Sequence, residues 1–168
     1  MAGTDPALQI AEALQQGAFD PQHAGELFLR ADAEKAVRGA LGGGVRIAVA
    51  GREASDIRPV TFLGARFVPD LVVDAGGKRI AVTITLLRND AGSMAQTLAG
   101  ALVLASRFSA VVAFVLDRRL AKADPFADPG ETREVRGLSD AERQLVEQLW
   151  QRHHVRIEIR RQDPLGWG

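Results

Sequence analysis

The sequence predicts a mixed α/β domain in which helices cover both faces of a single mixed β-sheet. Apolar residues recur at helical spacing in four segments, and these segments alternate along the chain with others that have strand-like patterns. Residues 110–117, AVVAFVLD, form a nearly continuous apolar run that is typical of a central strand buried on both faces. A length of 168 residues with 46% hydrophobic content suits one domain, residues 1–168, with one sizeable core.

Two helices are expected before the first strand. The first spans Pro6–Gln16 and is closed by Gly17. The second spans residues 21–41, because Asp20 can cap it and Pro21 suits a first helical turn. Three glycines, residues 42–44, then follow a helix and open a strand. A phosphate-binding loop has the reverse order, so these glycines indicate a helix-terminating turn.

The next elements are predicted to be strands. Residues 45–50 form one, residues 59–62 form a short one, and residues 66–74 and 79–87 form a hairpin. The turn of this hairpin contains two consecutive glycines, which tolerate positive φ.

A helix at residues 93–108 follows, with small and apolar side chains at spacings of three and four. It supplies the crossover that a parallel strand at residues 110–117 requires. Residues 124–130, with prolines at 125 and 129, are expected to form a surface loop.

The last two elements are a helix and a strand. Ser139 caps the helix, with Glu142 completing a capping box, and the helix extends to about His153. Residues 155–161, VRIEIRR, alternate apolar and charged side chains, which predicts an edge strand buried on one face.

Composition excludes several classes of site. There is no cysteine, so a metal would need oxygen or imidazole ligands. The 21 basic and 21 acidic residues give a formal net charge of zero, so any nucleic-acid surface would be local, and codon bias explains the excess of arginine over lysine. No stretch has the pattern of a membrane span or a signal peptide. We therefore expect a cytoplasmic protein with no membrane association.

The stretch FVPDLVVDAGGKRIAVTITLL, residues 67–87, resembles the core of the PD-(D/E)XK superfamily, the restriction-endonuclease-like nucleases. The resemblance implies a core of an amino-terminal helix, a three-stranded antiparallel meander, a crossover helix and a further strand. This core would cover residues 20–120, and residues 121–168 would be a carboxyl-terminal extension with a helix and an edge strand.

In such nucleases a divalent cation polarises the phosphate and activates water, and two carboxylates hold it at about 2.1 Å. The resemblance places Asp70 at the first carboxylate, Thr83 at the second and Thr85 at the lysine that helps to activate the water. Two hydroxyls thus stand where a charge pair would be needed. We expect no intact catalytic site and no cofactor, with Asp70 as a metal ligand only if a site persists.

Two alternatives remain open. A carboxylate from another element could restore a Mg²⁺- or Mn²⁺-dependent DNA endonuclease, and the candidates are Glu26, Glu34, Glu53 and Asp56, with Gln96 at a supporting position. Alternatively, Asp70 caps or tethers a strand and the resemblance is a coincidence of fold.

The expected function is therefore binding, as an accessory subunit for nucleic acid or for a protein partner. The candidate phosphate contacts are Arg66, Lys78, Arg79 and Arg88, although exposed basic residues at strand ends usually serve solubility. Self-association into a homo-oligomer is also expected, because an uncovered edge strand with the pattern of residues 155–161 favours pairing.

Overall fold

The computed structural model describes residues 3–52, 57–88, 92–119 and 138–162. Its main element is a five-stranded sheet with the order β1-β4-β5-β6-β7. The strands are β1 (Arg46–Val49), β4 (Leu71–Ala75), β5 (Lys78–Leu87), β6 (Ala110–Asp117) and β7 (Val155–Arg161). β1, β4 and β5 are antiparallel neighbours, whereas β5, β6 and β7 are parallel.

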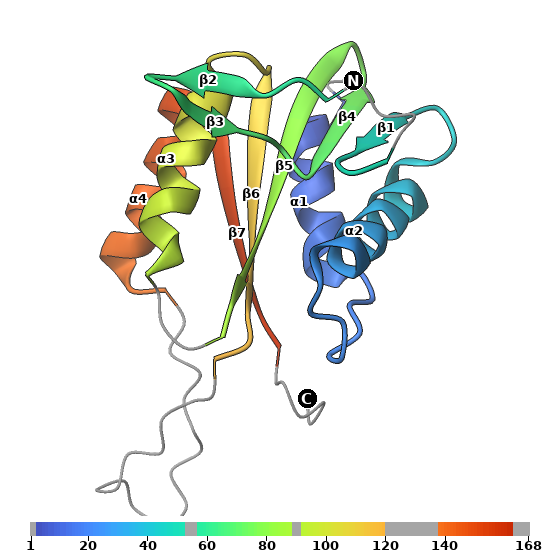
Figure 1. Ribbon diagram of the computed structural model, residues 1–168, viewed down its shortest axis with the longest axis horizontal. Coiled ribbons are helices and arrows are strands. Elements are labelled where there is room, and N and C mark those ends of the chain that lie inside the picture. Colours follow the sequence, from blue (N-terminus) through green and yellow to red (C-terminus); the bar gives the residue numbers. More distant parts are fainter. Residues whose placement is uncertain (1–2, 53–56, 89–91, 120–137, 163–168) are drawn as a thin grey trace, which may run out of the picture.

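Helices cover both faces of this sheet, as predicted (Figure 1). α1 (Pro6–Gln16) and α2 (Glu26–Leu41) pack on one face, and α3 (Ser93–Ala105) and α4 (Asp140–His153) pack on the other. All eight residues of β6 are buried, and Phe114 is the largest of its side chains. The prediction of a central strand buried on both faces is confirmed.

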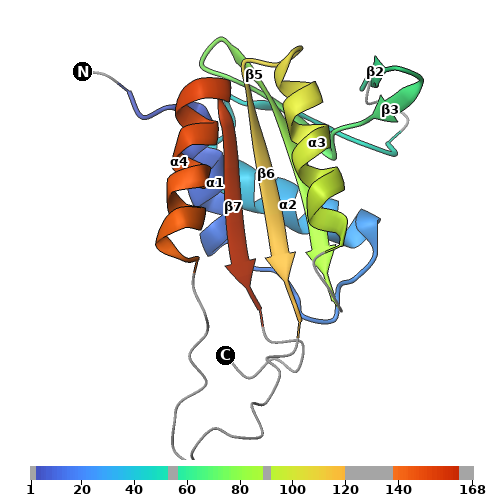
Figure 2. The ribbon, with the colours of Figure 1, turned by 90° about the vertical axis from the view of Figure 1, so that its left-hand side faces the viewer.

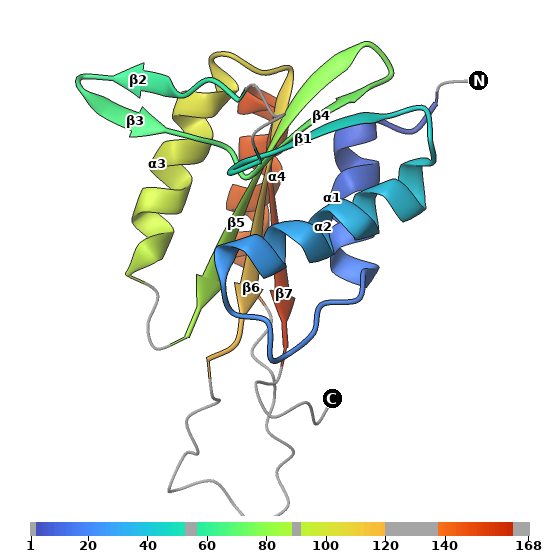
Figure 3. The same cartoon turned by 45° about the vertical axis from the view of Figure 1, so that its right-hand side comes forward.

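A second, two-stranded sheet was not predicted. β2 (Val60–Phe62) pairs with β3 (Ala65–Phe67), and this hairpin lies beside α3 (Figure 3). The prediction of one strand over residues 66–74 is wrong, because the three residues between β3 and β4 are not in a strand and interrupt it. Pro69 is one of them, and a proline has no N–H to donate to a strand ladder.

The start of α2 also differs from the prediction, since the helix begins at Glu26 after Gly25 as its cap. Asp20 makes a turn instead, in which its side chain accepts a bond from Gln22 N. The buried Arg118 donates to the carbonyl oxygens of Asp20 and His23, which holds this segment outside the helix.

Most other boundaries agree with the sequence to within one to three residues. The β4–β5 turn has positive φ at Gly76 and Gly77, and the Ser139 side chain accepts from Glu142 N at the start of α4. α3 ends at Ala105 rather than at residue 108. The loop expected at 124–130 lies outside the described residues.

β7 is an edge strand with β6 on one side only, and α1 and α4 pack against its two faces (Figure 2). Self-association through this edge stays a prediction. Among the described residues, no helix has the length and hydropathy of a membrane span.

Candidate functional site

A groove of about 550 Å³ follows the half of β5 that β4 does not cover. β4 begins at Leu71, which pairs with Val82, so residues 83–87 of β5 extend past the end of β4. α2 and α3 lie on either side of this part of β5 (Figure 3), and β3 contributes Arg66 and Phe67 to the lining of the groove. The break between β3 and β4 therefore creates the opening.

The groove brings together six of the residues that the sequence singled out. Its lining includes Glu26 from α2, Arg66 from β3, Asp70 at the start of β4, Thr83 and Thr85 from β5, and Gln96 from α3. These residues come from five parts of the chain, so their convergence depends on the tertiary fold.

Asp70 uses both carboxylate oxygens within the protein. Oδ2 accepts a bond from the backbone N–H of Ile84 at 2.7 Å, and Oδ1 accepts from Arg30 Nε at 2.7 Å. The Ile84 N–H faces the side from which β4 is missing, so the carboxylate replaces a strand partner there. Asp70 thus caps the end of the β4–β5 ladder, as the strand-tethering alternative requires, although the groove beside it is open.

Arg30 is a site residue that the sequence did not indicate. Its guanidinium also lies 3.3 Å from Glu26 Oε2 and donates to the carbonyl oxygen of Ala50 at 3.4 Å. Its side chain and that of Asp70 are 17% and 16% exposed, so this pair is largely shielded from water. The spacing of four residues between Glu26 and Arg30 could have indicated their pair on a helix. No local signal connects Arg30 to Asp70, which is 40 residues away.

Burial raises the pKa of Asp70 above its ordinary value, and the bonds from Ile84 N–H and Arg30 oppose this only in part. The neighbouring carboxylate of Glu26 raises the pKa further. The folded protein therefore holds this proton to a higher pH than the unfolded chain does. The contribution of Asp70 to stability therefore falls as pH rises from the ordinary value of 3.8 through the raised folded pKa.

We expect this effect to appear as a pH-dependent difference between the wild type and Asp70→Asn. The free energy of unfolding of the wild type should decrease relative to that of the variant as pH rises above about 4, because asparagine does not titrate. Urea denaturation of both proteins between pH 3 and pH 7 measures the difference. If the wild type instead gains stability relative to Asp70→Asn as pH rises, the Arg30 pair, and not burial, determines this pKa.

The two threonines face the same side of β5 but differ in their bonding. Thr85 Oγ1 lies 2.7 Å from Thr97 Oγ1 on α3, and Thr97 donates in turn to the carbonyl oxygen of Ser93. Thr83 Oγ1 is buried and has no hydrogen-bond partner within the described structure. A neutral, unpaired hydroxyl thus stands where the resemblance implies a carboxylate.

These residues do not fit a divalent cation. Among the described ranges there is no group of three aspartate, glutamate or histidine side chains that could hold one. Asp70 and Glu26 share the groove, but the Arg30 guanidinium already compensates both carboxylates. Arg30 therefore provides the positive charge that a metal ion would otherwise supply.

The other candidate carboxylates lie elsewhere or cannot be placed. Glu34 is paired with Arg52 and Arg38, and these bonds lower its pKa, with the bond from Arg52 as the largest cause. It does not line the groove. Glu53 and Asp56 lie outside the residues that the structure describes.

The predicted phosphate contacts do not form one patch. Lys78 and Arg79 begin β5, where they pair with Asp5 and Asp74, and Arg88 follows the opposite end of this ten-residue strand. Only Arg66 among the four lines the groove. A continuous basic surface through these four residues is therefore not present.

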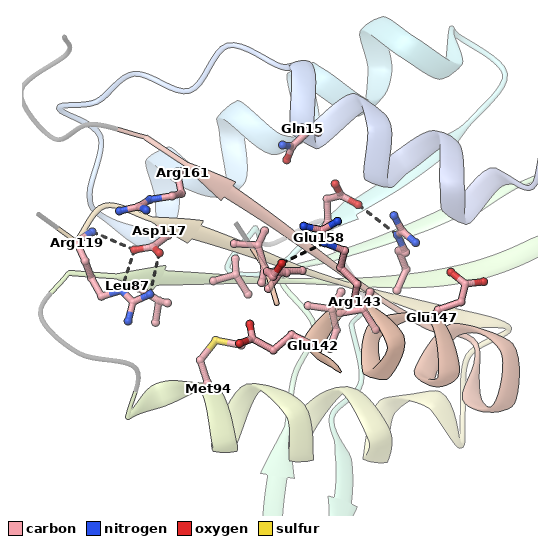
Figure 4. Close-up of a pocket in the computed structure, with 16 residues that line it drawn as sticks. Gln15, Leu87, Met94, Asp117, Arg119, Glu142, Arg143, Glu147, Glu158 and Arg161 are labelled. Carbon is pink, nitrogen blue, oxygen red and sulfur yellow. Dashed lines mark hydrogen bonds and ion pairs between the residues drawn. The ribbon is translucent and has the colours of Figure 1, made fainter. Parts of the chain in front are cut away.

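A second groove, of about 720 Å³, lies over β6 and β7 and is bordered by α4 (Figure 4). Gln15 of α1 and Met94 of α3 point into it from opposite sides. Its charges balance, and two of its ion pairs are Asp117–Arg119 and Arg156–Glu158. The lining acids are Asp117, Glu142, Glu147 and Glu158, and the lining bases are Arg119, Arg143, Arg156 and Arg161. This balance does not favour a ligand of either charge.

No protein family, curated protein or solved structure matches this chain.

Proposed function

We propose that this chain is a non-catalytic domain with a restriction-endonuclease-like fold, which acts by binding a macromolecular partner in the groove beside Asp70. The order and directions of its elements support this proposal. α2 precedes the antiparallel strands β1, β4 and β5, α3 then crosses over, and β6 runs parallel to β5. This is the arrangement that the resemblance of residues 67–87 implies.

One observation carries the non-catalytic part of the proposal. Both oxygens of Asp70 are bonded, to Arg30 and to Ile84 N–H, and Thr83 and Thr85 stand at the two further positions that the resemblance makes catalytic. Loss of a single charge-stabilising group commonly reduces an enzyme's rate by a factor of about 100 to 1,000. Loss of both a carboxylate and a lysine leaves the groove suited to binding.

We expect that Mg²⁺ or Mn²⁺ at millimolar concentration leaves the thermal unfolding midpoint of the wild type unchanged and supports no cleavage of plasmid DNA. Differential scanning fluorimetry and a gel assay measure these two properties. Asp70→Asn is the matched control, because it keeps the shape of the side chain and removes its charge. A Mn²⁺-dependent increase in the midpoint that Asp70→Asn abolishes would contradict the proposal.

The second candidate is a Mg²⁺- or Mn²⁺-dependent endonuclease with a relocated carboxylate. A specific observation favours Glu26 over the other relocated candidates, because Glu26 and Asp70 pair with the same guanidinium. This activity would require Arg30 to leave both carboxylates when a metal ion binds. The metal titration above therefore tests both candidates.

A further inference from the structure

The uncovered half of β5 presents backbone groups that have no strand beside them. Val82 O and Ile84 N both bond to Asp70, so these alternate residues face the side of β4. Because every second residue of a strand directs its N–H and C=O to the same side, Ile84 C=O and both backbone groups of Leu86 also face that side. Within the part of the chain that the structure describes, no backbone group bonds to them. They face the groove.

The two walls of the groove differ in polarity. Toward α2 it combines the apolar side chains of Leu29, Ile84 and Leu86 with the ion-paired Glu26 and Arg30. α3 contributes no charged residue to the lining, and on its side Thr85 bonds to Thr97, with Gln96 and the apolar Leu104 also in the lining. A β-strand laid along β5 would direct alternate side chains to these two walls.

The charges of the groove do not favour nucleic acid. Its charged residues are Glu26, Arg30, Arg66 and Asp70, which sum to zero, and Arg30 is already paired with both acids. Phosphate contacts need an excess of basic groups. Val68, which is 49% exposed, also lines the groove and offers apolar surface to a partner.

We propose that this groove binds an extended segment of another protein, which adds a strand to residues 83–87 of β5. The segment has apolar residues alternating with small polar residues, to match the two walls. Strand addition of this kind derives affinity from main-chain bonds and specificity from alternate side chains. The inference rests on the proposed binding function and names the class of partner.

The test uses the full chain and a display library of random linear peptides about 10 residues long, which suffices for one strand. The selected peptides should alternate apolar and small polar residues. Hydrogen exchange measured by NMR should show the Leu86 amide protected at least about tenfold more in the complex than in the free protein.

Two variants locate the binding site. Leu86→Pro removes the N–H that faces the groove and leaves the β5–β6 bonds intact, because Leu87 and its alternates face β6. It should lower peptide affinity about tenfold. Gln96→Trp should block the groove sterically. Ala99→Trp is the matched control, since residue 99 is exposed on the same helix but does not line the groove.

Three outcomes would overturn the inference. The first is that the library yields no binder. The second is that bound peptides leave Leu86 exchange unchanged and tolerate both Leu86→Pro and Gln96→Trp. The third is that labelled duplex or single-stranded oligonucleotides bind in the groove and lose affinity in Arg66→Ala. Oligonucleotide binding would contradict the strand-addition inference but not the proposed non-catalytic function. Metal-dependent cleavage of DNA would contradict the non-catalytic function.

Discussion

Asp70→Ala is expected to lower the free energy of unfolding by about 3 to 5 kcal/mol. The substitution leaves the largely buried Arg30 without its closest carboxylate and leaves Ile84 N–H without an acceptor. Removing one partner of a buried pair is strongly destabilising because the remaining charge stays out of water. Urea denaturation followed by circular dichroism at pH 7 measures the change.

Glu26→Ala is the matched control for this prediction. Glu26 pairs with the same arginine, but its side chain is 83% exposed, so its removal should change the free energy of unfolding by less than about 1 kcal/mol. If Asp70→Ala and Glu26→Ala have equal, small effects, Asp70 is not the strand cap that its bonds indicate.

The double variant Arg30→Met/Thr83→Glu is expected to gain a Mn²⁺ site that the wild type lacks. Removing Arg30 frees Asp70 and Glu26, and a glutamate at position 83 adds a carboxylate from the neighbouring strand. Divalent cations prefer such oxygen ligands, and ligand binding to the folded state raises the unfolding midpoint. An increase of about 3 to 8 °C at millimolar Mn²⁺ is expected in scanning fluorimetry.

Arg30→Met/Thr83→Gln has the same side-chain length without the charge, and it should show no Mn²⁺ response. If the two double variants respond alike, position 83 does not face the metal position of a nuclease, and the restriction-endonuclease-like interpretation of the fold loses its main support.

The sequence predicted those parts of the fold that depend on local signals. The two glycines of the β4–β5 turn have the predicted positive φ, and the groove contains Asp70, Thr83 and Thr85, which the resemblance had placed at one site. The apolar run of β6 identified the central strand, because a strand that is buried on both faces consists almost entirely of apolar residues.

Contacts between distant segments were not predictable in this way. No local signal connects Arg30 to Asp70, and only the fold brings the two side chains together. The late start of α2 depends on Arg118, which is 98 residues from Asp20. In both cases a long polar side chain determines the geometry, and its partner has no fixed sequence spacing.

Hydrogen bonds between the last strand, β7, and the end of the first helix, α1, affect the order of folding during synthesis. Arg160 of β7 donates to the carbonyl oxygens of Leu14 and Gly17, which end α1, and its guanidinium lies 5.4 Å from the Phe19 ring. Gln162 donates to Phe19 O. Gly17 precedes Arg160 by 143 residues, so the ribosome makes α1 long before the strand that holds its end. The α1–α2 layer can therefore reach its final packing only after β7 has left the ribosome, and a nascent chain stalled before β7 should remain incompletely folded.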